Sequence, residues 1–459
     1  MKLHRLIRMR LGYSLSAAVL LALVGSSAQA GFLTKNLQIC DQGDFFVGGV
    51  PKTTRFAGSV GGSTNYAQIT VGQMYVEFQV PVAAKKWPMI LWHGSTHSGA
   101  CVKSTPNGSE GWAPYLVRNN LATYVVDQAG RGRSGNDNSR IHEAAAALTG
   151  QLANSPDPTT TIPNIARITD NGSYTAWFGH LVTPGTATNC TDIITCELHP
   201  HGWRADDPSN TNVHPSPAGY LPTFALPPRG VLDFVQPVGL VFTGTGTWGP
   251  ATRAPATADA FKLHYYRQLL PNYESTLPSS TCQACSPMNK AAANTWSPRD
   301  VASLVERLGG AIVGTHSQSG SQGHDMVRIL KEDGQLGLLK GLITIEGGCS
   351  FANAGLTAAD FDNIPYLALK GDYTVFSQQC QDSVNAINAR RAMGQGTAKA
   401  DYILLDDPSY GGKFNGVSHM MMDDTNNLQV MDVMLEWAGE YITNPPSTGK
   451  CNSPPPPAT

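Results

Sequence analysis

Two serines that follow an apolar run are the residues best suited to covalent chemistry. The run Ala311-Ile-Val-Gly314 leads into Thr315-His-Ser-Gln-Ser-Gly320, the order of a buried strand and a tight turn into a helix. A serine at such a turn acts as a nucleophile when a histidine removes its proton. Ser317 is preferred, because Ser319 and Gly320 then supply small residues after it, but Ser319 stays an alternative. A noncatalytic serine- and glycine-rich loop is the competing interpretation, since both glycines of a G-x-S-x-G motif are missing.

A second turn, His93-Gly-Ser-Thr96, ends the apolar run Met89–Trp92. In acyl transfer the carbonyl oxygen becomes negatively charged, and backbone N–H groups beside the nucleophile stabilise it. The N–H groups of Ser95 and Gln318 are the predicted oxyanion-hole donors, with Thr96 as a substitute for Ser95. His93 is interpreted as a structural residue of this turn.

The base is expected to be a histidine downstream of the nucleophile, because the order nucleophile, acid, histidine is typical of this strand–turn–helix arrangement. Only His324 and His419 follow Ser317. His324 is too close in sequence to turn back over Ser317, whereas His419 lies in a loop between the last predicted strand and the last predicted helix. His419 is therefore the predicted base.

Two carboxylates are candidates for the acid, and the residues alone leave the choice open. Glu346 ends the apolar run 342–345, and Asp372 follows the run 366–369. Either could hold the imidazole of His419 in the required tautomer and stabilise its charged form. Placement one strand later is the ordinary arrangement and favours Asp372.

Short apolar runs that end in turns must position these residues. Such runs lie at 89–92, 122–126, 311–314, 342–345, 366–369 and 402–405. With helical stretches between them, they predict the α/β class, with a mostly parallel central sheet flanked by helices, as in the α/β-hydrolase fold. Residues 36–80 form a β-rich N-terminal segment, and 427–441 has the apolar spacing of a closing amphipathic helix.

Residues 136–300 interrupt this alternation and are rich in Pro, Thr, Asn and Gly. A segment this long is expected to fold as a cap or as loops over the sheet. Its pairs Cys190/Cys196 and Cys282/Cys285 are interpreted as local disulfides, because the C-x-x-C spacing has no second copy that would complete a metal site. The predicted domain spans 31–449, and 450–459 is a proline-rich tail.

The N-terminus has the pattern of a secretory signal peptide. Four basic residues, Lys2, Arg5, Arg8 and Arg10, precede the apolar run 11–24, and Ala28-Gln-Ala30 follows it as the cleavage site. The apolar run is shorter than the roughly 20 residues that span a membrane. A signal peptide at 1–30, a secreted or periplasmic location and no membrane span are predicted. The nine cysteines then predict disulfides, with one thiol left over or paired between chains.

Charged residues make up only 14% of the chain, hydrophobic residues 41%, and the formal net charge is −2. This composition permits a large core. It indicates neither a nucleic-acid partner nor binding to an anionic membrane surface.

The chain resembles a family of secreted bacterial α/β-hydrolase esterases. The matching stretches are Asp41–Gly49, Asp127–Ser134, His316–Gly320, Glu346 with its following glycines, Ser418–Met422 and Asn426–Val430. In this family the acid is a glutamate after the strand that follows the nucleophile, so the resemblance implies Ser317 as nucleophile, Glu346 as acid and His419 as base. It also implies a Cys349–Cys380 disulfide and a homodimer. The resemblance fails at Ser95-Thr96, where family members can carry adjacent cysteines, and between about 138 and 240.

The expected function is hydrolysis of a carboxylic ester, small or polymeric, through an acyl-enzyme on Ser317, with no cofactor and no metal. An amidase or a polyester depolymerase would use the same three residues. The alternative from another class is a noncatalytic binding protein on the same scaffold. It is disfavoured because a serine, a histidine and two candidate acids are all present.

Overall fold

The computed structural model describes residues 33, 35–54, 67–84, 87–105, 109–139, 292–371, 376–414, 417–424 and 426–444, with a few short stretches between 141 and 270. Several predictions lie outside these residues. They are the signal peptide 1–30, most of the insert 136–300, the cysteine pairs Cys190/Cys196 and Cys282/Cys285, the alternative acid Asp372 and the tail 450–459.

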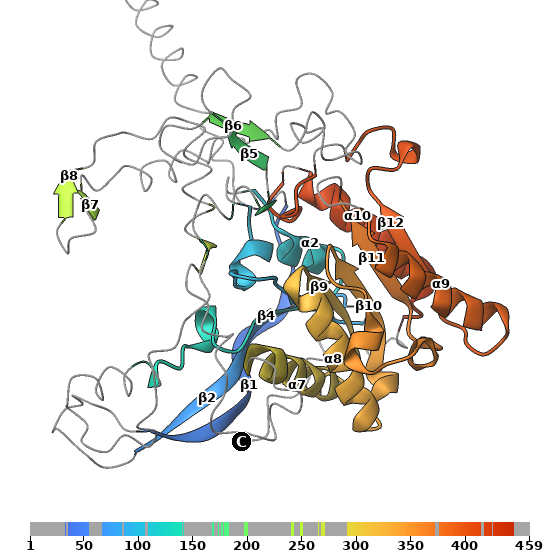
Figure 1. The fold of residues 1–459 in the computed structure, drawn as a ribbon, viewed down its shortest axis with the longest axis horizontal. Coiled ribbons are helices and arrows are strands. Elements are labelled where there is room, and N and C mark those ends of the chain that lie inside the picture. The colour runs from blue at the N-terminus through green and yellow to red at the C-terminus, as the bar shows by residue number, and fades with distance from the viewer. Residues whose placement is uncertain are drawn as a thin grey trace, which may run out of the picture.

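An eight-stranded sheet organises the described residues, in the order β1-β2-β4-β3-β9-β10-β11-β12. Its strands are β1 (Ile39–Thr54), β2 (Ala67–Pro81), β3 (Met89–Trp92), β4 (Thr123–Asp127), β9 (Ala311–His316), β10 (Leu339–Ile345), β11 (Tyr366–Lys370) and β12 (Ala400–Leu404). Strands β1 and β2 form an antiparallel hairpin, and β2 also pairs with β4 in the antiparallel direction. All other neighbouring strands of the sheet are parallel. The hairpin, in blue, extends past the rest of the sheet (Figure 1).

Helices cover both faces of this sheet. They are α2 (Trp112–Arg118), α7 (Ala292–Arg307), α8 (Gln318–Glu332), α9 (Gln378–Ala392) and α10 (Asn427–Tyr441). Successive strand residues point to opposite faces, so the apolar strands feed two cores. In β3, Met89 and Leu91 join a core with α2 and α10, whereas Ile90 and Trp92 join a core with α7, α8 and α9.

Each predicted apolar run corresponds to a strand of this sheet, and the predicted closing helix is also present. The β-rich N-terminal segment is the β1–β2 hairpin, and the helix predicted at 427–441 is α10. Two short strand pairs, β5–β6 (Gly179–Val182 with Glu197–Pro200) and β7–β8 (Leu240–Phe242 with Trp248–Pro250), lie within the predicted insert. Among the described residues, helices that are both long and apolar enough for a bilayer are absent.

Candidate active site

Ser317 occupies the junction between β9, which ends at His316, and α8, which begins at Gln318. Its backbone lies at φ 53° and ψ −116°, a combination that a residue with a side chain rarely adopts. The N–H of Ser317 donates to the carbonyl of Ile345 at 2.9 Å, which ties the turn to the end of β10. Strained backbone of this kind gathers at functional sites, where the surrounding structure holds it in place. The strand therefore turns sharply at Ser317 and leaves this residue half-buried.

Two glycines outside the G-x-S-x-G positions make this sharp turn possible. A Cβ on Gly94 would lie 2.9 Å from Cβ of Ser317, and a Cβ on Gly320 would lie 2.8 Å from Cα of Gly347. Such distances are shorter than ordinary van der Waals contact, so side chains do not fit there. The turn after β3 thus lies against the serine, and the start of α8 lies against the backbone that follows Glu346.

The alternative nucleophile, Ser319, is fully buried. Its hydroxyl accepts a hydrogen bond from the N–H of His316 at 2.8 Å and donates one to the carbonyl oxygen of Trp92 at 2.9 Å. Because backbone groups occupy this hydroxyl, its position in the turn is structural. Of the two serines, only Ser317 has partial access to solvent.

His419 and Glu346 form a close pair at the same edge of the sheet. Nδ1 of His419 lies 2.5 Å from Oε2 of Glu346, whose side chain is fully buried. The other carboxylate oxygen of Glu346 accepts from the N–H of Gly371 at 2.7 Å. A carboxylate at this distance keeps the ring proton on Nδ1, so Nε2 is the nitrogen that can accept another proton. The pair has the geometry of a base with its orienting acid.

Strand register explains why Glu346 lies near the serine. In the β9–β10 pair His316 is opposite Ile345, so Ser317 and Glu346 are the first residues after two adjacent parallel strands. Glu346 also has a positive φ, 45°, which turns the chain at this point. His419 comes from the segment between β12 and α10, as the sequence predicted. Its backbone N–H donates to the carbonyl of Trp177 at 3.0 Å.

Two further histidines, one at the end of β9 and one within α8, are both neutral. Burial holds the pKa of His316 well below its usual range, and Nε2 of His316 donates to the carbonyl oxygen of His419 at 2.9 Å. His324 is buried in α8, where Nε2 lies 3.3 Å from the Tyr366 hydroxyl, and burial lowers its pKa to about 4. His316 therefore anchors the loop of His419 without adding charge, and His324 belongs to the core.

The predicted oxyanion donors lie on the turn after β3 and at the start of α8. Gln318 is the first residue of α8, so its N–H is among the helix N–H groups that lack an intrahelical acceptor. On the other side, Thr96 has a positive φ of 59° and its carbonyl accepts from Leu270 at 2.7 Å. The close approach of Gly94 to Ser317 brings this turn beside the serine.

Aromatic residues from the predicted insert also reach the site, which sequence reasoning missed. The ring of Trp177 lies 6.4 Å from that of His419 and 5.2 Å from that of His97. The Tyr265 hydroxyl lies 3.2 Å from Nε2 of His97, and burial lowers the pKa of His97 to about 3. These side chains form a neutral wall beside His419. Sequence reasoning missed Trp177 and Tyr265 because both lie in the insert 136–300, where the strand-and-helix alternation that placed the other residues is interrupted.

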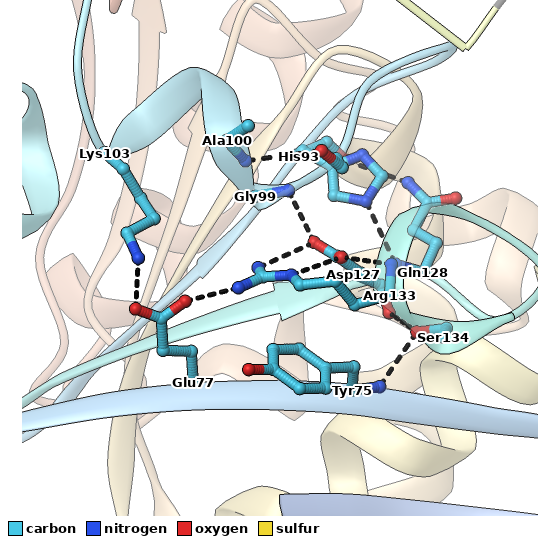
Figure 2. A network of polar contacts seen from close by, with 11 residues as sticks. Tyr75, Glu77, His93, Gly99, Ala100, Lys103, Asp127, Gln128, Arg133 and Ser134 are labelled. Atoms are coloured by element: carbon cyan, nitrogen blue, oxygen red, sulfur yellow. Dashed lines mark hydrogen bonds and ion pairs between the residues drawn. The ribbon is translucent and has the colours of Figure 1, made fainter. Parts of the chain in front are cut away.

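A charged network underlies the turn after β3 (Figure 2). Asp127, at the end of β4, is buried and accepts from the N–H of Gly99 at 2.6 Å and from Nε of Arg133 at 2.9 Å. Burial alone would raise the pKa of Asp127, but the hydrogen bonds and charge of Arg133 lower it, with a contribution from His93. Arg133 also pairs with Glu77 on β2. The network fixes the glycine-rich loop after β4 against the turn that carries Ser95.

Comparison with one solved structure supports the fold. Neither a protein-family model nor a curated protein matches the chain. A solved structure described as a novel bacterial esterase is 23% identical, with a TM-score of 0.59, and the match covers 89% of this chain and 98% of that one. Naproxen esterase (carboxylesterase NP) from Bacillus subtilis is 10% identical at a TM-score of 0.28, covering 84% of this chain and 92% of that one. The mostly parallel sheet with its flanking helices is an α/β-hydrolase fold, as the sequence predicted.

The described cysteines are consistent with the expected disulfide. Cys349 and Cys380 are bonded, which confirms the pairing that the resemblance implied, and Cys101 is a buried free thiol. Among the described residues there is no group of three or more His, Cys, Asp or Glu that could hold a metal ion.

Proposed function

We propose that this protein is a serine hydrolase that cleaves carboxylic esters through an acyl-enzyme on Ser317. The observation that carries the proposal is the 2.5 Å contact between His419 Nδ1 and Glu346 Oε2, next to a serine in a strained strand-to-helix turn. The likeness to the novel bacterial esterase, at 23% identity, supports the scaffold on which this chemistry would occur.

The reaction follows from these positions. Nε2 of His419 takes the proton of Ser317 as Oγ bonds to the ester carbonyl carbon, whose oxygen becomes an oxyanion. The N–H groups of Ser95 and Gln318 stabilise that oxyanion. The bond to the alcohol then breaks, and His419 returns its proton to the leaving oxygen. Water repeats the sequence on the acyl-enzyme, releases the carboxylic acid and restores Ser317.

The partners of His419 suit this proton transfer. The side chain of Glu346 is fully buried, so its charge acts on the imidazolium with little screening by solvent. His316 is neutral, because burial lowers its pKa, and so it does not repel the charged imidazole. The neutral wall, to which Trp177 and Tyr265 belong, favours a neutral ester over a charged one.

Active-site labelling tests the nucleophile. A fluorophosphonate probe is expected to label the folded wild-type protein on Ser317, and Ser317→Ala should abolish labelling. Ser319→Ala tests the alternative nucleophile: Ser317 should still be labelled, at a cost of about 1–3 kcal/mol in stability because the buried N–H of His316 loses its acceptor. Absence of label from the wild-type protein would reject the hydrolase and favour a noncatalytic binding protein.

Two isosteric variants test the acid. Glu346→Gln is expected to lower kcat by about 10³- to 10⁴-fold, because a neutral amide does not hold the required tautomer of His419. Asp372→Asn should stay within about threefold of the wild type. Loss of activity in Asp372→Asn alone would transfer the acid role to Asp372.

An amidase or a polyester depolymerase is the second candidate, since the same residues serve all three reactions. Release of p-nitrophenol from short-chain esters, without release of p-nitroaniline from the matching anilides, identifies the esterase.

We further propose export through the signal peptide 1–30 and assembly as a homodimer. N-terminal sequencing of the exported protein and its sedimentation in solution test these two proposals.

A further inference from the structure

The carbonyl oxygen of Gly94 receives two side-chain contacts beside the candidate oxyanion hole. Nδ1 of His93 lies 2.8 Å from this oxygen, and Nη1 of Arg131 donates to it at 3.1 Å. The carbonyl of Gly94 and the N–H of Ser95 belong to one planar, conjugated peptide group. Donors on the oxygen of this group therefore act on the N–H that we assign to the oxyanion.

The hydrogen bonds of His93 determine which ring nitrogen donates. The backbone N–H of Gln128 donates to Nε2 of His93 at 2.9 Å, and Nε2 of Gln128 donates to the carbonyl of His93 at 2.8 Å. Because Nε2 of His93 accepts, the ring proton resides on Nδ1. Burial lowers the pKa of His93 to about 4, so the ring is neutral near pH 7. Nδ1 of His93 therefore donates to Gly94.

Arg131 brings a positive charge to the same oxygen. Its side chain is 1% exposed, and a guanidinium stays protonated in proteins. A hydrogen bond from a charged donor is roughly twice as strong as a neutral one, and low local polarity strengthens it further. The loop that contains Arg131 is held in place in two ways. The backbone N–H of Arg131 donates to the carbonyl oxygen of Gln128 at 3.0 Å, and the network around Asp127 fixes the rest of the loop (Figure 2).

We propose that Arg131 and His93 are positioning residues that polarise the Gly94–Ser95 peptide and strengthen the Ser95 N–H as an oxyanion donor. This inference rests on the proposed function. Hydrogen bonds in a chain reinforce one another by about 10–30% each. The gain is largest when the oxyanion carries its full charge, so it lowers the barrier to reaction more than it improves substrate binding. If Arg131 only held the loop in place, its positive charge would have no effect on kcat or on inhibitor affinity.

Arg131→Met tests the proposal, because methionine keeps the bulk of the side chain but lacks donor and charge. We expect kcat to fall about 10-fold, a fraction of the roughly 10²- to 10³-fold loss when a whole oxyanion donor is removed. KM should change less than about threefold. Affinity for an alkyl trifluoromethyl ketone, whose adduct with Ser317 carries an oxyanion, should fall by the same factor as kcat. Arg131→Lys keeps the charge and should restore most of both quantities.

Arg390→Met is the matched control, since it also removes an arginine with its ion pair, to Asp362, but lies outside the network around Asp127. It should leave kcat and inhibitor affinity within about threefold of the wild type. Equal losses of kcat in Arg131→Met and Arg390→Met would overturn the proposal, and so would wild-type kcat in a folded Arg131→Met variant.

A pair of His93 variants keeps the proposal testable if Arg131→Met fails to fold. Asparagine places an amide donor near the position of Nδ1, whereas glutamine places an acceptor near Nε2. His93→Asn thus retains a donor to Gly94, and His93→Gln retains an acceptor for Gln128 instead. We expect kcat to be at least threefold higher in His93→Asn, and equal values would overturn the proposal. A wild-type protein that neither hydrolyses esters nor labels would instead reject the proposed function.

Discussion

Gly320→Ala is expected to reduce activity strongly while changing stability little. Gly320 lies in the first turn of α8, three residues after Ser317, and faces the backbone that follows Glu346. A methyl group at this position would lie 2.8 Å from Cα of Gly347 and 2.8 Å from N of Gly348. The substitution therefore forces apart the turn that carries the candidate nucleophile and the loop that carries the candidate acid.

The expected losses of stability and of kcat in Gly320→Ala can be worked out from these distances. Carbon atoms prefer a separation of about 3.5–4.0 Å, so one of the two segments must move by roughly 0.7 Å or more. Overpacking costs about 1–3 kcal/mol, and alanine offsets about 1 kcal/mol of it because it favours the helix over glycine. The expected net loss of stability is about 0–2 kcal/mol. A displacement approaching 1 Å at reacting groups lowers rates by about 10²-fold, so kcat should fall about 10- to 100-fold.

The assay compares kcat on p-nitrophenyl acetate with the midpoint of thermal unfolding. Gly439→Ala in α10 is the control, because a methyl group there has no neighbour within 4 Å. This variant should be slightly more stable than the wild type and equally active. Wild-type kcat in Gly320→Ala would refute the reasoning, since it would show that the close approach of the two segments does not position the candidate catalytic groups.

Three further predictions concern the support of the site. Replacing Cys349 and Cys380 by serine should lower the unfolding free energy in urea by about 3–4 kcal/mol, because the bridge joins residues 31 apart. Unchanged stability would contradict this. Burial lowers the pKa of His324 to about 4, below the roughly 6.5 of an unfolded histidine, so its stabilising effect is complete above pH 6.5 and is lost as the pH falls toward 4. His324→Gln should therefore lose about 3 kcal/mol less than the wild type between pH 7.5 and 4, and parallel losses would refute this. Asp424→Ala should cost about 2–4 kcal/mol, because the N–H and hydroxyl of Ser418 each lose a 2.8 Å bond. Asp424→Asn keeps an acceptor and should lose less, so equal unfolding midpoints would contradict the assignment.

Much of the parallel sheet could be predicted because its strands are buried on both faces and so read as short apolar runs. The prediction for β3, Met89–Trp92, matches the structure. Other boundaries shifted where polar residues continue a strand. β9 extends through Thr315 and His316, since Thr315 bonds to the carbonyl of Ile343 and His316 pairs with Ile345. A polar residue whose hydrogen bonds are satisfied inside a sheet has no hydrophobic signal.

Placement along the chain singled out Ser317 and His419, but it left Glu346 and Asp372 open. The distance between His419 and Glu346 depends on strand register and on the course of a distant loop, neither of which a local pattern encodes. Trp177 reaches His419 from the long insert, where no periodicity guides a prediction. The contact of Arg131 with Gly94 was missed for the same reason: its meaning depends on two loops that meet only in the folded chain.

Ser317 and Glu346 follow the adjacent strands β9 and β10, so the candidate nucleophile and acid both come from one continuous stretch of chain, β9–α8–β10. A chain divided between α9 and β12 would leave the candidate nucleophile, the candidate acid and the Cys349–Cys380 disulfide on one fragment and His419 on the other. Reassembly of two such fragments would restore turnover only when the C-terminal piece docks through β12 and α10 in its native register. Ester hydrolysis would then act as a direct reporter of fragment complementation, and its rate would measure how accurately the last strand of the sheet has assembled.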